Sequence, residues 1–312
     1  MELNNKQKYK ISVTTALGVN SIFYIISLME HGFNIHSIFV QTNRYRAKRE
    51  RKKLKELGFR YLMTYLKNYV TYKVLKLPTS FKGYIYTVIY NTNLGKKLIN
   101  KIKNKDDVKS LDQFKEIKQY ELDYFTSLKI IKRVVKEANA PTQIIKTQKI
   151  NGSDTEAFLK KNKIDILVIS GGTIIRSNIL NSISKCAITI HNSFLPYLRG
   201  WGGGEVWALI HDRKEALGTT IFYTEKGVDS GDILNQENLK IDTDDTIDTL
   251  RYKNIILGKK LIIQAIELLL SDNAPRMVQN NKYVTHINRR PNKNEKIIAI
   301  DNLEKWKLEI HK

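Results

Sequence analysis

The first forty residues alternate between apolar and polar positions in a way that predicts a strand, a helix and a second strand. Residues 10–16 (KISVTTA) and 34–41 are short runs rich in apolar and β-branched side chains, as expected of buried strands. Between them, residues 20–30 carry apolar side chains at helical spacing. The turn after the first run contains Gly18 but no GxGxxG motif, so the pattern does not support a dinucleotide site.

The same alternation returns further along the chain. The expected strands there are 142–148, 164–170, 186–191, 218–223 and 232–236. The expected helices are 153–163, a short one ending near Leu180, 205–212 and 246–270. Strands separated by helices predict a parallel, doubly wound, Rossmann-like α/β sheet whose site lies at the carboxyl ends of the strands. We expect one α/β domain, made of residues 1–42 and 141–272, and a short C-terminal extension, 273–312.

Residues 43–140 interrupt this pattern and are expected to form a basic, aromatic, mainly helical insertion. The chain has a net charge of +22, and within residues 44–105 there are 18 lysines and arginines against two acidic residues. A concentrated positive field attracts polyanions, whether RNA, an anionic membrane or a pyrophosphate-bearing substrate. We expect peripheral contact of 44–105 with an anionic membrane ahead of RNA binding, and leave a homodimer open. A lysine-rich coding bias is the alternative explanation of the charge.

The composition also indicates a cellular compartment. The single cysteine, Cys186, excludes an intramolecular disulfide framework and argues against a cysteine-based zinc site. The N-terminal segment is polar, and the longest apolar runs are shorter than the roughly 20 residues that span a bilayer. We therefore expect a cytoplasmic protein, with membrane contact at most at the periphery.

Two segments bring candidate chemistry to the edge of the predicted sheet. The strand 186–191 ends in His191, and strand alternation places Thr189 on the same face. Further on, glycines flank the segment 227–232, which can present Asp229. A histidine that faces a carboxylate can act as an acid, a base or an electrostatic stabiliser.

Three motifs in order, IDILVISGGTIIRSNIL, IHNSFLPYLRG and GTTIFYTEKGVDSGDIL, extend this observation to residues 153–236. This stretch resembles the catalytic domain of the 10-formyltetrahydrofolate-dependent formyltransferases. That family includes the glycinamide ribonucleotide, methionyl-tRNA and sugar N-formyltransferases. The resemblance implies a one-carbon transferase that uses 10-formyltetrahydrofolate as co-substrate and no metal.

The resemblance also implies roles for individual residues. His191 would stabilise the oxyanion that forms when a primary amine attacks the formyl carbon, and Asp229 would position the reaction and relay the amine proton through water. The residues implied in folate binding are Thr173, Ile174, Ile175, Arg176 and Val228. The sequence departs from the family at Thr189, where the family has an asparagine whose amide donates to the oxyanion. Losing one such donor costs on the order of 10² to 10³ in rate.

The acceptor is expected to be the amino group of a nucleotide-linked amino sugar, as used in surface-glycan synthesis. Arg199 and Trp201 are candidate acceptor contacts. Asn192 is a third candidate, although strand alternation points it away from His191. One alternative is a methionyl-tRNA formyltransferase-like enzyme. Others are a catalytically weakened folate-fold protein that binds RNA or membrane through its basic face, and hydrolysis of the formyl folate with water as acceptor.

Overall fold

The computed structural model describes residues 6–42, 124–200, 203–284 and 287–310 of the 312-residue chain. The described residues before 43 and from 127 onward belong to one compact unit. Most of the expected insertion, including 44–105, for which we expect membrane contact, lies outside the described residues, and the domain boundaries stay predictions. Among the described residues, no helix combines the length and the apolar character needed to cross a membrane.

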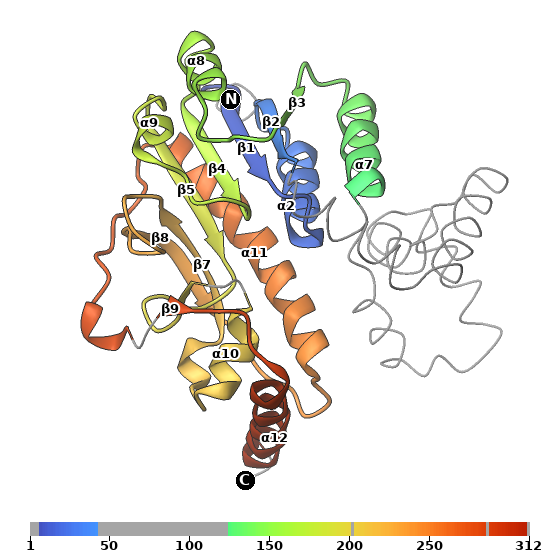
Figure 1. The fold of residues 1–312 in the computed structure, drawn as a ribbon, viewed down its shortest axis with the longest axis vertical. Coiled ribbons are helices and arrows are strands. Elements are labelled where there is room, and N and C mark those ends of the chain that lie inside the picture. The colour runs from blue at the N-terminus through green and yellow to red at the C-terminus, as the bar shows by residue number, and fades with distance from the viewer. Residues whose placement is uncertain (1–5, 43–123, 201–202, 285–286, 311–312) are drawn as a thin grey trace, which may run out of the picture. The chain divides into compact units, whose positions relative to one another are not determined.

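A seven-stranded sheet forms the centre of the compact unit (Figure 1). Its strands are β1 (Ile11–Thr15), β2 (Ile35–Gln41), β3 (Gln143–Thr147), β4 (Ile166–Ser170), β5 (Cys186–His191), β7 (Gly218–Tyr223) and β8 (Ile233–Asn238). The order across the sheet is β3-β2-β1-β4-β5-β7-β8. Every residue of the central strands β1 and β4 is buried, because helices cover both faces of a parallel sheet.

The expectation of a wholly parallel sheet is wrong for the last two strands. β3, β2, β1, β4 and β5 are parallel, whereas β7 is antiparallel to both β5 and β8. The physical reason for the β7–β8 pairing is the short connection between them. A parallel pair needs a crossover of a dozen or more residues, so neighbouring strands joined by a shorter loop run antiparallel.

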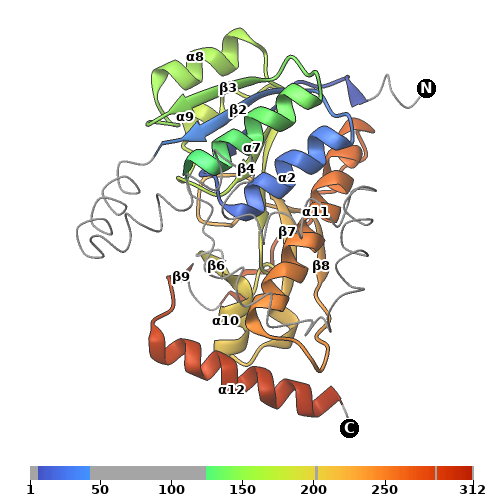
Figure 2. The same cartoon turned by 90° about the vertical axis from the view of Figure 1, so that its right-hand side faces the viewer.

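Helices pack on both faces of the sheet. The α-helices of the described residues are α2 (Val19–Glu30), α7 (Tyr124–Glu137), α8 (Ser153–Lys161), α9 (Ser177–Leu180), α10 (Gly204–Ile210), α11 (Ile247–Leu270) and α12 (Lys293–Ile310). Figure 2 shows α2, α7 and α11 on one face and α8 and α9 on the other. A capping box between Thr246 and Thr249 begins α11, which packs against α2. Gly258 of α11 permits this approach, because a Cβ there would lie 2.5 Å from the Tyr24 hydroxyl.

The C-terminal segment shares the core of the α/β unit. Helix α12 lies against α10, and its Ala299, Leu303 and Trp306 are buried in one apolar cluster with Leu198 and Trp207. A two-residue strand, β9 (Ile287–Asn288), also pairs with β6 (Arg199–Gly200). The segment expected to be a short extension is thus connected to the chain that directly follows β5.

Candidate active site

His191 ends β5 and is held by the backbone that follows it. The side chain is buried, and its Nε2 lies 3.0 Å from the carbonyl oxygen of Leu198. A carbonyl can only accept, so Nε2 carries a hydrogen and donates. The ring packs edge-on against Phe222. Nδ1 is therefore the ring nitrogen left for other chemistry.

Asp229 meets His191 from the β7–β8 connection. Its Oδ2 lies 3.8 Å from His191 Nδ1, farther than a direct hydrogen bond, and the Asp229 side chain is 18% exposed. The same Oδ2 accepts a hydrogen bond of 2.7 Å from the Gly200 N–H. Two residues expected to act together, separated by 38 positions in the sequence, thus lie next to each other, and their catalytic role stays a prediction.

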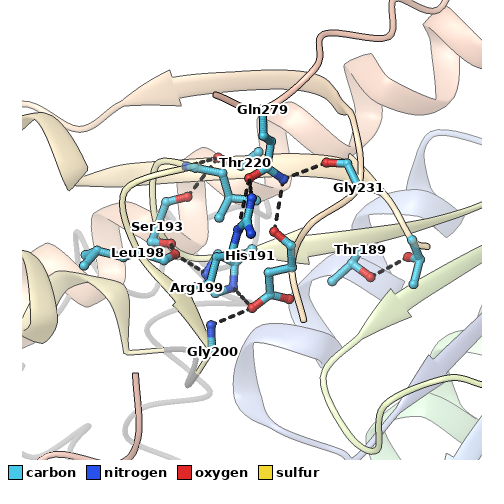
Figure 3. Close-up of polar contacts among 12 residues, drawn as sticks. Thr189, His191, Ser193, Leu198, Arg199, Gly200, Thr220, Gly231 and Gln279 are labelled. Carbon is cyan, nitrogen blue, oxygen red and sulfur yellow. Dashed lines mark hydrogen bonds and ion pairs between the residues drawn. The ribbon is translucent and has the colours of Figure 1, made fainter. Parts of the chain in front are cut away.

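Three consecutive residues, Leu198 to Gly200, connect these two side chains. The Leu198 carbonyl accepts from His191 and also from Ser193 Oγ at 2.7 Å, and Gly200 donates to Asp229 (Figure 3). Gly200 has φ of +100°, and a Cβ there would lie 2.5 Å from the Asn288 carbonyl oxygen. Only glycine fits this position, because both its φ and the close backbone exclude a side chain.

Thr189 lies outside the contacts that join His191 and Asp229. Its Oγ1 is 2.7 Å from Thr224 Oγ1, and Figure 3 shows Thr189 apart from His191. Asn192 also has an internal partner, since its Oδ1 accepts from the buried Tyr24 hydroxyl at 3.3 Å. Burial raises the pKa of Tyr24 well above its usual range, so this hydroxyl stays a donor.

The 171–176 loop follows β4 and is the segment expected to contact folate. The Thr173 N–H donates to Gln41 Oε1 at 3.0 Å, and the Asn151 side chain bonds the Ile174 carbonyl and the Arg176 N–H. Thr173, Ile174 and Arg176 are exposed, whereas Ile175 is buried in the core. Val228, on the 227–232 loop, is partly buried. Gln41 and Asn151 could not be predicted from the sequence, because no local motif links them to this loop.

Arg199 is bound internally. Its Nε and Nη2 donate to Gln279 Oε1 at 3.2 and 2.7 Å, and Nη2 also donates to Asn281. Partial burial lowers the pKa of Arg199, and the charge of Asp229 opposes this effect. Trp201, the other expected acceptor contact, lies outside the described residues.

An ion pair with a buried carboxylate lies at the start of α10. Glu205 is 1% exposed, and its Oε1 accepts from Arg251 Nε at 2.7 Å. The charge of Glu205 is the main cause that raises the pKa of Arg251. Within the described ranges, no group of three or more histidine, cysteine, aspartate or glutamate side chains is arranged to hold a metal ion.

Comparisons with known proteins extend this description. The sequence model of the formyl transferase family matches residues 89–266, more than half of the chain. The chain is 33% identical over 144 residues to a methionyl-tRNA formyltransferase of Methylacidiphilum infernorum, covering 46% of this chain and 44% of that protein. The chain spans about half or less of the length of such relatives.

Solved structures share the fold. A 4-N formyltransferase from Francisella tularensis matches with a TM-score of 0.51 and 14% identity, covering 95% of this chain and 87% of that one. A sugar 3N-formyl transferase solved with dTDP and 5-N-formyl-THF matches with a TM-score of 0.50 and 13% identity, covering 95% and 79%.

Proposed function

This chain belongs to the formyl transferase family, and we propose that it transfers a formyl group from 10-formyltetrahydrofolate to a primary amine. The observation that carries the proposal is the approach of His191 Nδ1 to Asp229 Oδ2, 3.8 Å apart at the carboxyl end of β5. An imidazole and a carboxylate at that place can serve the two needs of the reaction, which are charge stabilisation and proton removal.

The 171–176 loop suits a folate donor. Gly171 and Gly172 have φ of +72° and +116°, and the exposed Thr173 and Ile174 follow them. The loop backbone is held by Gln41 and Asn151, so its shape does not depend on the ligand. In our proposal Thr173, Ile174, Ile175 and Arg176 hold the pterin through backbone groups and Val228 encloses it. Bound 10-formyltetrahydrofolate supplies the formyl group.

His191 and Asp229 then have separate tasks. Because Nε2 of His191 already donates to Leu198, the Nδ1 side of the ring faces the reacting carbonyl. In our proposal the ring reacts as the imidazolium, whose Nδ1–H donates to the oxygen on which negative charge develops. The carboxylate of Asp229 accepts the proton that the attacking amine loses, through water. The Gly200 N–H fixes Asp229 Oδ2 during this transfer and leaves lone pairs for the proton.

Thr189 makes this site differ from the family pattern. Its hydroxyl already contacts Thr224, so we propose that it contributes little to the developing oxyanion. The reaction is expected to be slower than in a site with asparagine at this position. Thr189 favours one alternative, which is a catalytically weakened protein that binds RNA or membrane.

We propose a nucleotide-linked amino sugar as the acceptor. Two proteins that share the fold are described as a 4-N formyltransferase and a sugar 3N-formyl transferase. A second candidate is methionyl-tRNA, because relatives that match this chain in sequence are described as methionyl-tRNA formyltransferases. In both cases the nucleophile is a primary amine, so the two acceptors need the same chemistry from His191 and Asp229.

The test is a formyl-transfer assay with 10-formyltetrahydrofolate and two sets of acceptors, aminated nucleotide sugars and methionyl-tRNA, read by mass gain. We expect turnover with an amino sugar and its loss in His191→Ala. His31→Ala is the matched control, because His31 is the C-cap of α2 and its ring contacts the Ser27 carbonyl and Phe33, neither of which belongs to the site. If only methionyl-tRNA is formylated, the acceptor is methionyl-tRNA and not an amino sugar. If neither set is formylated, the proposed activity is overturned.

A further inference from the structure

The side chain of Gln279 contacts the 227–232 loop, and both its amide oxygen and its amide nitrogen make hydrogen bonds. It is 6% exposed. Its Oε1 accepts two hydrogen bonds from Arg199, and its Nε2 donates to the carbonyl oxygens of Asp229 at 3.0 Å and Gly231 at 2.6 Å (Figure 3). A guanidinium only donates and a carbonyl only accepts, so the partners determine which end of the amide is oxygen.

These contacts form a closed ring that includes Asp229, and His191 is bonded to the residue next to it. Gln279 links the Arg199 side chain to the Asp229 backbone, and the neighbouring Gly200 N–H links the same strand to the Asp229 carboxylate. The residue before Arg199, Leu198, accepts from His191. Both members of the pair are thus bonded to residues 198–200, which Gln279 contacts through Arg199.

The backbone of Asp229 needs such support. Its φ is +48°, in the left-handed region that residues other than glycine seldom adopt. The conformation persists only where the surroundings determine it. Gln279 bonds the carbonyl of this same residue and that of Gly231, so it acts on the part of the loop that directs the carboxylate.

We propose that Gln279 is a positioning residue for formyl transfer, which holds Asp229 in register with His191 by joining the 227–232 loop to Arg199. This inference rests on the proposed function for its kinetic part. It assigns a role at the site to the C-terminal segment, from a residue that belongs to none of the sequence motifs. Gln279 itself touches neither reacting group.

Two variants separate the two sides of the amide. Gln279→Glu keeps the acceptor for Arg199 but turns an oxygen toward the two loop carbonyls, which repels them. Gln279→Met keeps the length of the side chain and removes both the acceptor for Arg199 and the donor to the loop carbonyls. Asn281→Ala is the matched control, because it takes a partner from Arg199 without touching the loop carbonyls.

The readouts are steady-state kinetics and hydrogen exchange of the peptide 224–232 in the free protein. We expect kcat to fall about 10- to 100-fold in both Gln279 variants, the size of effect that a misplaced catalytic group produces, with the KM for the formyl donor changed less than about threefold. Exchange in 224–232 should accelerate in both variants. Asn281→Ala should change kcat by less than about threefold.

The inference is overturned if Gln279→Glu keeps kcat within about twofold of wild type, or if its 224–232 exchange matches wild type. Gln279→Glu decides alone if Gln279→Met fails to fold. If the wild-type protein transfers no formyl group to any acceptor, the proposed function fails, and hydrogen exchange still decides whether Gln279 holds the loop.

Discussion

The 171–176 and 227–232 loops both follow strands of the same sheet and are held in different ways. The first follows β4 and is fixed by Gln41 and Asn151, which lie at the end of β2 and directly before α8. The second follows β7 and is fixed by Gln279, from the chain beyond the last strand of the sheet. The loop expected to bind the donor is thus supported within the α/β layers, and the loop that carries Asp229 is supported from outside them.

This difference predicts that binding and turnover respond to different substitutions. Changes around the 171–176 loop should alter the affinity for the formyl donor, and changes around the 227–232 loop should alter kcat. Thr189 lies between the two, because it pairs with Ile169 of β4 across the sheet and contacts Thr224 at the start of the second loop's connection.

The largest expected effect is that of Asp229→Asn. Asparagine tolerates the left-handed backbone and still accepts from Gly200, so the loop stays in place while the proton acceptor is lost. We expect kcat to fall at least about 100-fold and affinity for the formyl donor to change less than about threefold. Steady-state kinetics and a fluorescence titration of the donor measure both quantities.

The matched control is Asp232→Asn on the same connection, which loses only an ion pair with Arg276, whose Nη1 is 3.5 Å from Asp232 Oδ2. It should keep kcat within about twofold, since surface ion pairs contribute little. If Asp229→Asn turns over at the wild-type rate, Asp229 is not the proton acceptor.

Thr189→Asn is expected to raise kcat by about tenfold, a part of what a well-placed oxyanion donor contributes. The longer amide can reach beyond the Thr224 hydroxyl that now holds Thr189 Oγ1. Thr189→Val measures what the present hydroxyl contributes. Unchanged or lower kcat in Thr189→Asn would show that the site is built around threonine, and a tenfold loss in Thr189→Val would make the hydroxyl itself a donor.

Gln41→Leu should weaken donor binding and leave turnover intact. The Thr173 N–H would lose its acceptor, and a hydrogen bond contributes about 1 kcal/mol, or about fivefold in KM. Gln143→Leu on the neighbouring strand β3 is the matched control, because Gln143 is exposed. A fall in kcat at constant KM would contradict the division of tasks between the two loops.

The sequence predicted what local patterns determine. The end of β5 at His191 and the glycine-flanked loop around Asp229 are both visible in short segments, and the resemblance to the family is confirmed by the match to residues 89–266. Helix α11 was likewise expected from Thr246 onward, and Thr246 is its N-cap.

Contacts between distant segments were not predictable in this way. Gln279 has no neighbouring motif, and its partners lie 48 to 80 positions away. Helix α12 was missed as part of the core because exposed isoleucines, such as Ile297 and Ile300, stand among its buried positions and obscure the helical pattern. Across the chain, local spacing located the candidate pair, and tertiary contacts determine how it is held.

The smallest expected effect comes from Cys186, at the opposite end of β5 from His191. Burial raises the pKa of its thiol to about 11, against the smaller opposing effects of Lys185 and Arg276. At pH 8 the thiolate is scarce, so alkylation should be tens of times slower in the folded than in the denatured chain. Because the folded-state pKa is raised, the neutral thiol stabilises the fold below about pH 9, and this contribution is lost as the pH rises toward 11.

Cys186 is the single cysteine, so one thiol assay follows it alone. Once alkylated, the protein should keep kcat within about twofold, because Cys186 begins β5 whereas His191, which Asp229 contacts, ends it. A large loss of turnover would mean that the two ends of β5 are coupled and that the site does not depend on the two loops alone.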